Sequence, residues 1–239
     1  MLEFSLIVPT YNEEGRMEAP VQGVAEYLRR RFSKWEAIYV DDGSKDSTYD
    51  KLLQLRAMHS EFRVLHYEKN RGKGFAVRKG LEAARGNLIL FSDADFSTPI
   101  QELETLMKQM SNGFDIVIGS RGLPDSKVDV HQPWFRETIG KSGNLLVRAS
   151  LPIDFTDTQC GFKLFTKKAA QFLLPRLTIE GFAFDIEILA VAQFHGLRIA
   201  EVPVVWRDIP KSKVRLRHSF EVLRDLFTIR YRLAMGRYA

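Results

Sequence analysis

Asp93 and Asp95 have the clearest chemical meaning of any residues in this 239-residue chain. They lie one residue apart, directly after the apolar run 87–92. Carboxylate oxygens are hard ligands that favour Mg²⁺ or Mn²⁺ over softer metals, and such a cation usually neutralises a diphosphate. We therefore expect a divalent metal here, with Asp95 as the main ligand and Asp93 near a ribose or the water shell of the metal.

The two aspartates also have a simpler explanation, which is that they cap a helix predicted to begin near Pro99. Capping needs only one polar side chain, and Ser97 or Thr98 stands next to the proline. A cap therefore does not account for the pair, and the metal-site interpretation explains it better.

Two earlier apolar runs also end in polar clusters. Residues 4–10 are followed by Tyr-Asn-Glu-Glu at 11–14, and the run 35–41 leads into Asp-Asp-Gly-Ser at 41–44. A turn with a helix cap explains the second cluster in part, but it leaves Asp41 and Asp42 side by side. A hydrogen-bonding or cationic partner would relieve the electrostatic cost of that arrangement. Three acidic strand ends in a basic protein predict a nucleotide-sugar site.

Cationic side chains stand at two further positions of this kind. Arg71 and Lys73 alternate with glycines at 70–74, which is typical of an anion site at a helix amino terminus, although a glycine-shaped turn explains the pattern equally well. Arg121 follows the run 115–119 and suits bidentate contact with a phosphate. The spacing of a P-loop is missing, and no G-x-G-x-x-G follows the first strand, which disfavours a dinucleotide dehydrogenase.

The elements that position these residues follow from the alternation of short apolar runs with helical patterns. It predicts an α/β fold with a mainly parallel, Rossmann-like sheet and helices on both faces, in which the carboxyl ends of the strands converge on one cleft. The predicted strands are 4–10, 35–41, 63–67, 87–92, 115–119 and 198–206, and the predicted helices are 14–31, 46–59, 74–85, 99–111, 134–149 and 183–195. Residues 123–133 are predicted to form a loop.

Composition indicates one large domain with a well-buried core, because 45% of the residues are hydrophobic. Cys160 is the single cysteine, so an internal disulfide is excluded and a packing role is expected. The amino terminus does not resemble a signal peptide, and no stretch approaches the ~20 apolar residues of a membrane span.

The last part of the chain is expected to be a separate, basic helical segment at 211–239, following a main domain at 1–210. Two apolar stripes run along residues 214–234 at helical spacing, one through Phe220 and Phe227 and the other through Leu226 and Ile229. Such a helix would cover the core, pair with another subunit in a homo-oligomer, or lie in a membrane surface.

Taken together, these motifs resemble the family 2 glycosyltransferases with the GT-A fold. The resemblance runs through nearly the whole chain, and its later half is similar to the dolichyl-phosphate β-glucosyltransferase branch, whereas the related mannose synthases share the first half. The stretches that carry this later similarity are 157–165, 184–189, Trp206 with Ser212-Lys213, and 224–230.

The resemblance implies roles for individual residues. Asp93 and Asp95 would serve the ribose, the diphosphate and the metal, and Arg136 and Ser142 would bind the phosphate of the acceptor. The expected contacts to the nucleotide sugar and its phosphates are Pro9, Tyr11, Glu13, Asp41, Asp42, Lys73, Asp93, Ala94, Arg121, Arg207 and Lys213.

The implied reaction is an inverting, metal-dependent transfer of a hexose from a nucleoside diphosphate sugar to a polyprenyl phosphate. UDP-glucose is the favoured donor and GDP-mannose the next. A phosphate monoester arrives largely ionised, because its second pKa is about 6, so it needs no strong base. Asp157 or Asp185 would orient sugar hydroxyls, or act as base if the acceptor were a hydroxyl. With Asp95 and Arg121, they form the predicted catalytic set.

Three alternatives stay open. The protein would be a mannose synthase, a polysaccharide-building enzyme with a hydroxyl acceptor, or, more remotely, a non-catalytic nucleotide-binding protein. Nucleic acid is not an expected partner, because the acidic strand ends would repel a phosphate backbone. The expected location is cytoplasmic, peripheral on the cytoplasmic face of a membrane.

Overall fold

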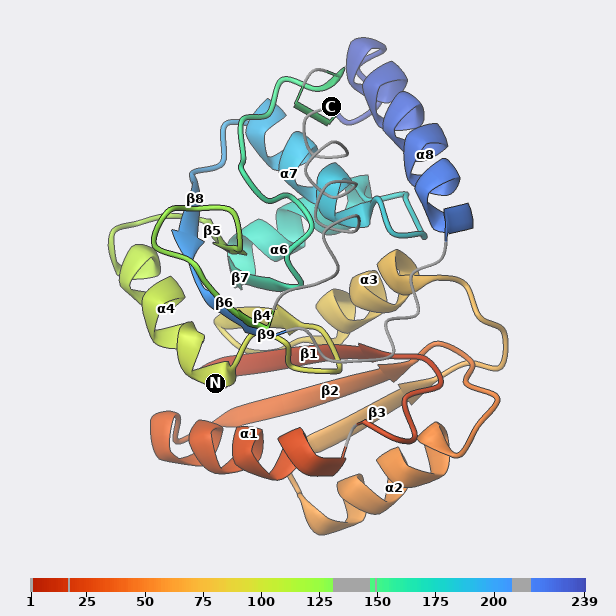
Figure 1. The fold of residues 1–239 in the computed structure, drawn as a ribbon, viewed down its shortest axis with the longest axis vertical. Helices are drawn as coiled ribbons and strands as arrows, with labels where there is room; N and C mark the ends of the chain where they lie inside the picture. The colour runs from red at the N-terminus through yellow and green to blue at the C-terminus, as the bar shows by residue number, and fades with distance from the viewer. Residues whose placement is uncertain (1, 17, 131–146, 149, 208–215) are drawn as a thin grey trace.

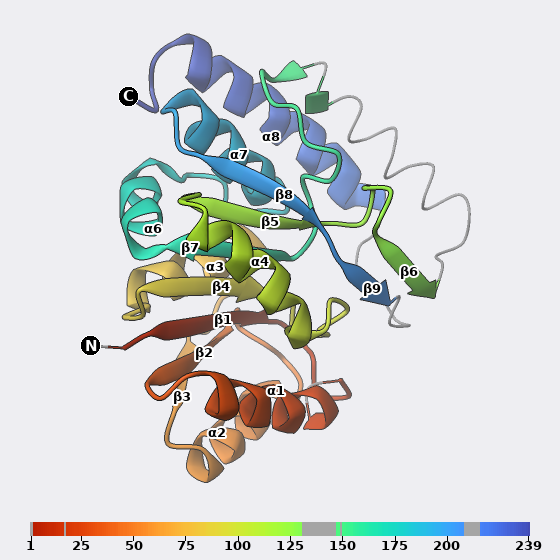
Figure 2. The same ribbon diagram turned by 90° about the vertical axis from the view of Figure 1, so that its left-hand side faces the viewer.

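The computed structural model describes residues 2–16, 18–130, 147–148, 150–207 and 216–239 of the chain. Seven strands form one sheet in the order β3-β2-β1-β4-β7-β5-β8 (Figures 1 and 2). All neighbouring pairs are parallel except those made by β7, which runs antiparallel between β4 and β5. The strands are β1 (Phe4–Thr10), β2 (Trp35–Asp41), β3 (Phe62–His66), β4 (Leu88–Ser92), β5 (Ile116–Ser120), β7 (Phe162–Thr166) and β8 (Ile199–Pro203).

Helices cover both faces of this sheet. One face packs against α1, α2 and α4, and the other packs against α3, α6, α7 and α8. The helices are α1 (Glu18–Arg31), α2 (Thr48–Met58), α3 (Lys73–Ala83), the 3₁₀ turn η1 (Ile100–Glu102), α4 (Leu103–Ser111), α6 (Lys167–Leu173), the 3₁₀ turn η2 (Leu174–Arg176), α7 (Phe184–Phe194) and α8 (Leu216–Ala234).

The central strands are buried on both sides. Every residue of β1 and β2 is buried, and in β1 the side chains of Leu6 and Val8 join one core while Ile7 joins the other. Continuous apolar runs of this kind are what a parallel sheet between two helical layers requires. The mainly parallel α/β architecture is therefore confirmed.

Two parts of the sheet differ from the expectation. The predicted loop 123–133 contains β6 (Lys127–Val130), which pairs in parallel with β9 (Val205–Arg207) in a separate two-stranded ribbon. The strand predicted over 198–206 is divided at Val204, because the backbone hydrogen bonds of this residue pass from the end of β5 to the start of β6. Its N–H donates to Ser120 O at 3.2 Å, and its own carbonyl accepts from Lys127 N at 3.2 Å.

Strand β7 and helix α6 were not predicted. The reason lies in Lys163, which interrupts the short apolar run of β7 with a charged residue, although its side chain is fully buried. Insertion of β7 between β4 and β5 separates the two halves of the sheet by one antiparallel strand.

Helix α8 packs against α7 along one side of the molecule (Figure 1). Within the described ranges, none of the helices combines the length and the apolar character required to cross a bilayer.

Candidate active site

The candidate site lies where β1 and β4 part. Beyond β1 the chain turns to β2 on one side, whereas β4 lies on the other, and ligands of open α/β sheets bind at such a switch point. The pairing of β1 with β4 ends at Ile7 and Phe91, but its pairing with β2 continues to Thr10 and Asp41. Pro9, which has no N–H to donate, lies in the part of β1 that β4 does not pair with.

The loop of Asp93 and Asp95 follows β4 directly and is held by specific contacts. Asp93 N donates to Gly161 O at 3.0 Å, and the carboxylate of Asp93 packs against the Cα of Gly161 so closely that a Cβ there would collide with it. Asp95 Oδ1 accepts from Ser97 N at 3.0 Å. Phe96, which lies between Asp95 and Ser97, has a positive φ of 49°.

The structure rules out the simpler explanation, in which these residues cap the helix that follows the loop. The helical segment after the loop begins as η1 at Ile100, and its amino terminus receives no side-chain hydrogen bond. Pro99 precedes it in an extended conformation with ψ of 143°. Neither Ser97 nor Thr98 is its cap, and Asp95 instead bonds the backbone of its own loop.

Lys73 is the first residue of α3 and reaches Asp93. Its Nζ lies 2.7 Å from Asp93 Oδ1 as an ion pair that lacks hydrogen-bond alignment, and this oxygen accepts no hydrogen bond from the described residues. The ammonium also faces the rings of Phe91 and Phe184 at 5.4 and 5.8 Å. Burial lowers the pKa of Lys73, but Asp93 and Asp185 outweigh it and raise the pKa above its ordinary value. Lys73 therefore stays cationic.

Arg121, just after β5, forms the second charged pair with Asp157. Its Nε and Nη2 donate to the two carboxylate oxygens at 2.6 and 2.9 Å, and its backbone N donates at 3.1 Å. Burial raises the pKa of Asp157, but the guanidinium outweighs burial and lowers it below its ordinary value. Glu201 on β8 fixes this turn by accepting from Asp157 N at 2.8 Å. Arg121 also lies 5.5 Å from the ring of Trp206.

A third charged pair is buried beneath the site. Lys163 Nζ donates to Asp185 Oδ1 at 2.6 Å and to Cys160 O at 2.7 Å. Burial raises the pKa of Asp185 above its ordinary value, and the nearby cations Lys163 and Lys73 reduce this rise without cancelling it. Burial also raises the pKa of Cys160 to about 12. Its thiol is thus protonated at neutral pH, which agrees with the packing role expected for this residue.

The acidic pair after β2 is satisfied by the protein itself. Asp41 accepts from His66 Nδ1 at 2.7 Å and from Ser44 Oγ. Asp42 accepts from the backbone N–H groups of Arg71 and Gly72, both at 2.8 Å. Burial raises the pKa of Asp42, and these N–H groups limit the rise. The expected relief of the pair therefore comes from protein groups, and Asp42 fixes the 70–74 turn through the N–H groups of Arg71 and Gly72.

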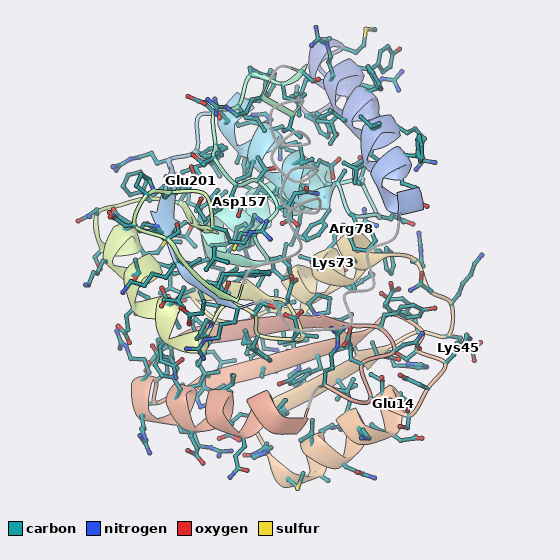
Figure 3. The ribbon with its side chains drawn as sticks, viewed as in Figure 1. Glu14, Lys45, Lys73, Arg78, Asp157 and Glu201 are labelled. Carbon is teal, nitrogen blue, oxygen red and sulfur yellow. The ribbon has the colours of Figure 1, made fainter. Side chains whose placement is uncertain are left out.

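The loops after β1 and β2 are joined by hydrogen bonds and together form one wall of the site. Asn12 N donates to Ser44 Oγ at 2.8 Å, and Glu13 N donates to Thr48 Oγ1 at 2.7 Å. Tyr11, with 37% exposure, lies on this wall. Figure 3 shows Glu14 and Lys45 of the two loops beyond the strand ends, and Lys73 and Asp157 nearer the middle of the molecule.

Arg207 approaches the site through its backbone. Its N–H donates to Ser97 O at 2.9 Å, so β9 lies beside the loop of Asp95. Its side chain is exposed and pairs with Asp129 at 3.0 Å. The positions expected to bind phosphate at Arg136, Ser142 and Lys213 lie outside the described residues. The contacts of all these residues to a nucleotide sugar stay predictions.

Gly161 and Lys163 were expected only as part of the motif at 157–165, and no role was expected for Glu201. A glycine next to cysteine and a lysine inside an apolar run were the available signals for the first two. Glu201 had no signal, because its contact with Asp157 spans 44 residues of sequence.

The described residues contain no group of three or more metal-ligating side chains. Asp93 and Asp95 fit a divalent metal nevertheless, because Mg²⁺ is usually bound by one or two carboxylates together with phosphate oxygens and water. Asp93 Oδ1 is buried and accepts no hydrogen bond within the described ranges, but it is ion-paired with Lys73. Asp95, which forms no ion pair among the described residues, is therefore the carboxylate left to meet a cation.

Comparison with known proteins gives concordant results. The family model of glycosyl transferase family 2 matches residues 5–174. The dolichyl-phosphate beta-glucosyltransferase of Homo sapiens is 36% identical over 248 residues, covering 98% of this chain and 76% of that protein. The Dictyostelium discoideum enzyme of the same name is 36% identical over 245 residues, covering 97% of this chain and 75% of that protein.

Solved structures agree on the fold. Glucosyl-3-phosphoglycerate synthase from Mycobacterium tuberculosis, crystallised with Mn²⁺ and UDP-glucose, superposes with a TM-score of 0.69 at 21% identity, covering 95% of this chain and 79% of that one. Mannosyl-3-phosphoglycerate synthase from Rubrobacter xylanophilus gives 0.69 at 21% identity, covering 99% and 75%.

Proposed function

Because this chain belongs to glycosyl transferase family 2, and is thus a glycosyltransferase, we propose that it transfers glucose from UDP-glucose to a polyprenyl phosphate of the dolichyl type. The relatives that match 97–98% of the chain carry the name of that activity. The observation in the site that supports it is that two cations, Lys73 and Arg121, both interact electrostatically with Asp93.

The proposed donor and acceptor are both anions, so the main task of the site is electrostatic. An acceptor phosphate oxygen forms a bond to the anomeric carbon while the bond from that carbon to the diphosphate breaks, and the configuration inverts. Lys73 keeps its positive charge beside Asp93, and Arg121 keeps its own beside Asp157. Both would stabilise the negative charge that develops on the leaving diphosphate.

No proton has to move in this reaction, because the acceptor phosphate is already ionised. Asp157 and Asp185 are accordingly free to act as positioning groups. Each is bonded to a cation of the protein, Arg121 and Lys163 respectively, which is unfavourable for a general base. A hydroxyl acceptor would require one of them to take a proton, so this arrangement favours the phosphate acceptor.

We further propose that Asp95, with Asp93, holds Mg²⁺ or Mn²⁺, which when bound neutralises the diphosphate. The lipid acceptor implies work at a membrane surface, with the main domain at 1–210 outside the bilayer and the protein peripheral on its cytoplasmic face.

The test is a donor and acceptor panel with a matched pair of variants. UDP-glucose and GDP-mannose, each carrying a labelled sugar, are offered with Mg²⁺ or Mn²⁺ to polyprenyl phosphate and to a sugar alcohol. We expect the label in the lipid fraction from UDP-glucose. Asp95→Asn should lower transfer by about 100-fold or more and weaken Mn²⁺ binding in a calorimetric titration. Asp50→Asn, the same change at an exposed position of α2, should change neither.

Label transferred mainly to the sugar alcohol would replace the lipid acceptor with a hydroxyl acceptor. Preference for GDP-mannose would make the protein a mannose synthase. Full transfer and unchanged Mn²⁺ binding in Asp95→Asn would refute the assignment of the metal site.

A further inference from the structure

Helix α8 carries two apolar faces instead of one. Its inner face packs on the core through Leu226 and Ile229, which are 2% and 0% exposed. The opposite face presents Phe220, Phe227 and Tyr231 at 74%, 69% and 53% exposure. Spacings of seven and four residues place these three aromatic side chains on one line along the helix. Of the two stripes read from the sequence, one is buried and the other is left facing outward.

This exposed face is unusual within the molecule. Eight large hydrophobic side chains are exposed among the described residues, and half of them lie between residues 220 and 235: Phe220, Phe227, Tyr231 and Met235. Isolated exposed apolar residues are ordinary, but a concentration of them indicates an interaction site. The inner face already supplies the packing that holds α8 in place, so the outer face is not needed for the fold.

The charges around this face select its partner. Arg224, Arg230 and Arg237 are exposed around the aromatic line, and the acids nearby are Glu221 and Asp225. Asp225 is only 6% exposed and already pairs with Arg224 at 2.9 Å. Phe and Tyr flanked by arginines match the boundary between lipid headgroups and acyl chains, where rings insert and cations meet anionic headgroups.

A second copy of the chain fits this face less well. A twofold dimer brings the same patch together from both subunits, so Arg224, Arg230 and Arg237 would meet their own copies. Of the described acids, only the half-buried Glu221 and the buried Asp225 lie among them, and these are too few to compensate. Charge complementarity therefore favours an anionic surface.

We infer that the outward face of α8 docks on an anionic lipid bilayer through Phe220, Phe227 and Tyr231. The helix begins on the side of the molecule toward which the carboxyl ends of β1 and β4 point (Figures 1 and 2). Docking through α8 thus holds the site next to the lipid surface. The identification of the acceptor in that surface depends on the proposed function, but vesicle binding itself does not.

The experiment is co-sedimentation of the full chain with vesicles of phosphatidylcholine containing about 30% phosphatidylserine. Phe227→Glu and, separately, Phe220→Glu remove one aromatic anchor each. Met58→Glu on α2, with 66% exposure, is the matched control because it places the same charge on an equally exposed apolar position. Thermal unfolding and size-exclusion with light scattering accompany each variant.

Binding of the wild type and Met58→Glu, with roughly 10- to 100-fold weaker binding of both phenylalanine variants, would support the inference. High salt should weaken the wild-type binding. Equal binding of all variants, or no wild-type binding, would overturn it. A wild-type dimer that Phe227→Glu converts to a monomer would assign the face to a second copy instead.

Transfer of glucose to a short, water-soluble prenyl phosphate without vesicles separates the two proposals. Phe227→Glu should perform it at the wild-type rate. Absence of this transfer in every protein, combined with intact vesicle binding, would refute the proposed function and leave the docking face standing.

Discussion

Gly161→Ala tests how the loop of Asp93 and Asp95 is positioned. The Cα of Gly161 lies directly against the carboxylate of Asp93, and a Cβ at this position would collide with all three atoms of that carboxylate. The Gly161 backbone cannot retreat freely, because its carbonyl accepts from Asp93 N at 3.0 Å. The substitution should therefore push Asp93 out of place while leaving its chemistry intact.

The magnitude follows from the collision. Overpacking by one methyl group typically costs about 1–3 kcal/mol, and about 1 kcal/mol lowers the melting temperature of a chain of this size by roughly 2–4 °C. Displacement of a reacting group by about 1 Å can lower the rate about 100-fold. We thus expect a modest loss of stability and a large loss of transfer.

Gly23→Ala is the matched control. Gly23 lies inside α1, is exposed and has no atom within 4 Å of an added Cβ. The same substitution there should raise the unfolding free energy by up to about 1 kcal/mol, since alanine is the better helix former, and should leave transfer unchanged. Thermal unfolding and initial transfer rates measure both effects. Wild-type rate and stability in Gly161→Ala would refute the reasoning.

Three further predictions concern other parts of the molecule. Hydrogen bonds from Arg29 lower the pKa of Glu61 to about 2, below the unfolded value of about 4.3. The free energy of unfolding in urea should be higher for the wild type than for Glu61→Gln by at most about 1 kcal/mol at pH 6, and this difference should shrink as the pH falls below about 4 and vanish below about 2. The Cys160 thiol, 1% exposed, should resist a thiol reagent at pH 8 in the native protein and react in denaturant; rapid native labelling would contradict its burial. Tyr238→Phe removes the hydroxyl that donates to the buried Glu187 at 2.8 Å and should cost about 1–3 kcal/mol in urea unfolding.

The sequence was most informative where burial on both faces leaves an apolar run. Strands β1 and β2 have the predicted bounds of 4–10 and 35–41, because each core forces hydrophobic residues at successive positions. It was least informative at β7, where Lys163 occupies an inward position. A charged residue there is tolerated only because Asp185 and the carbonyl of Cys160 receive its ammonium, and neither partner is identifiable from local sequence.

The candidate site shows the same division. The acidic and cationic strand ends could be recognised from residue types, since parallel strands bring their carboxyl ends to one edge. Which acid pairs with which cation could not be predicted, because this depends on the order of the strands in the sheet. Arg121 meets Asp157 only because β7 is inserted between β4 and β5, which places the turn before β7 beside the end of β5.

These pairings give Asp95 a distinct place among the acids of the site. Three carboxylates each have a cation of the protein within 2.7 Å, in the pairs Asp93 with Lys73, Asp157 with Arg121, and Asp185 with Lys163. Among the described residues, Asp95 forms no such ion pair and accepts only the N–H of Ser97. Three of the acids are thus neutralised by cations of the protein, whereas the half-buried carboxylate of Asp95 is not. A diphosphate alone would be repelled by that charge, whereas a diphosphate that arrives with a divalent cation would be attracted to it. On the proposed metal site, donor binding should depend on Mg²⁺ or Mn²⁺, and Asp95→Asn should remove this dependence without unfolding the protein.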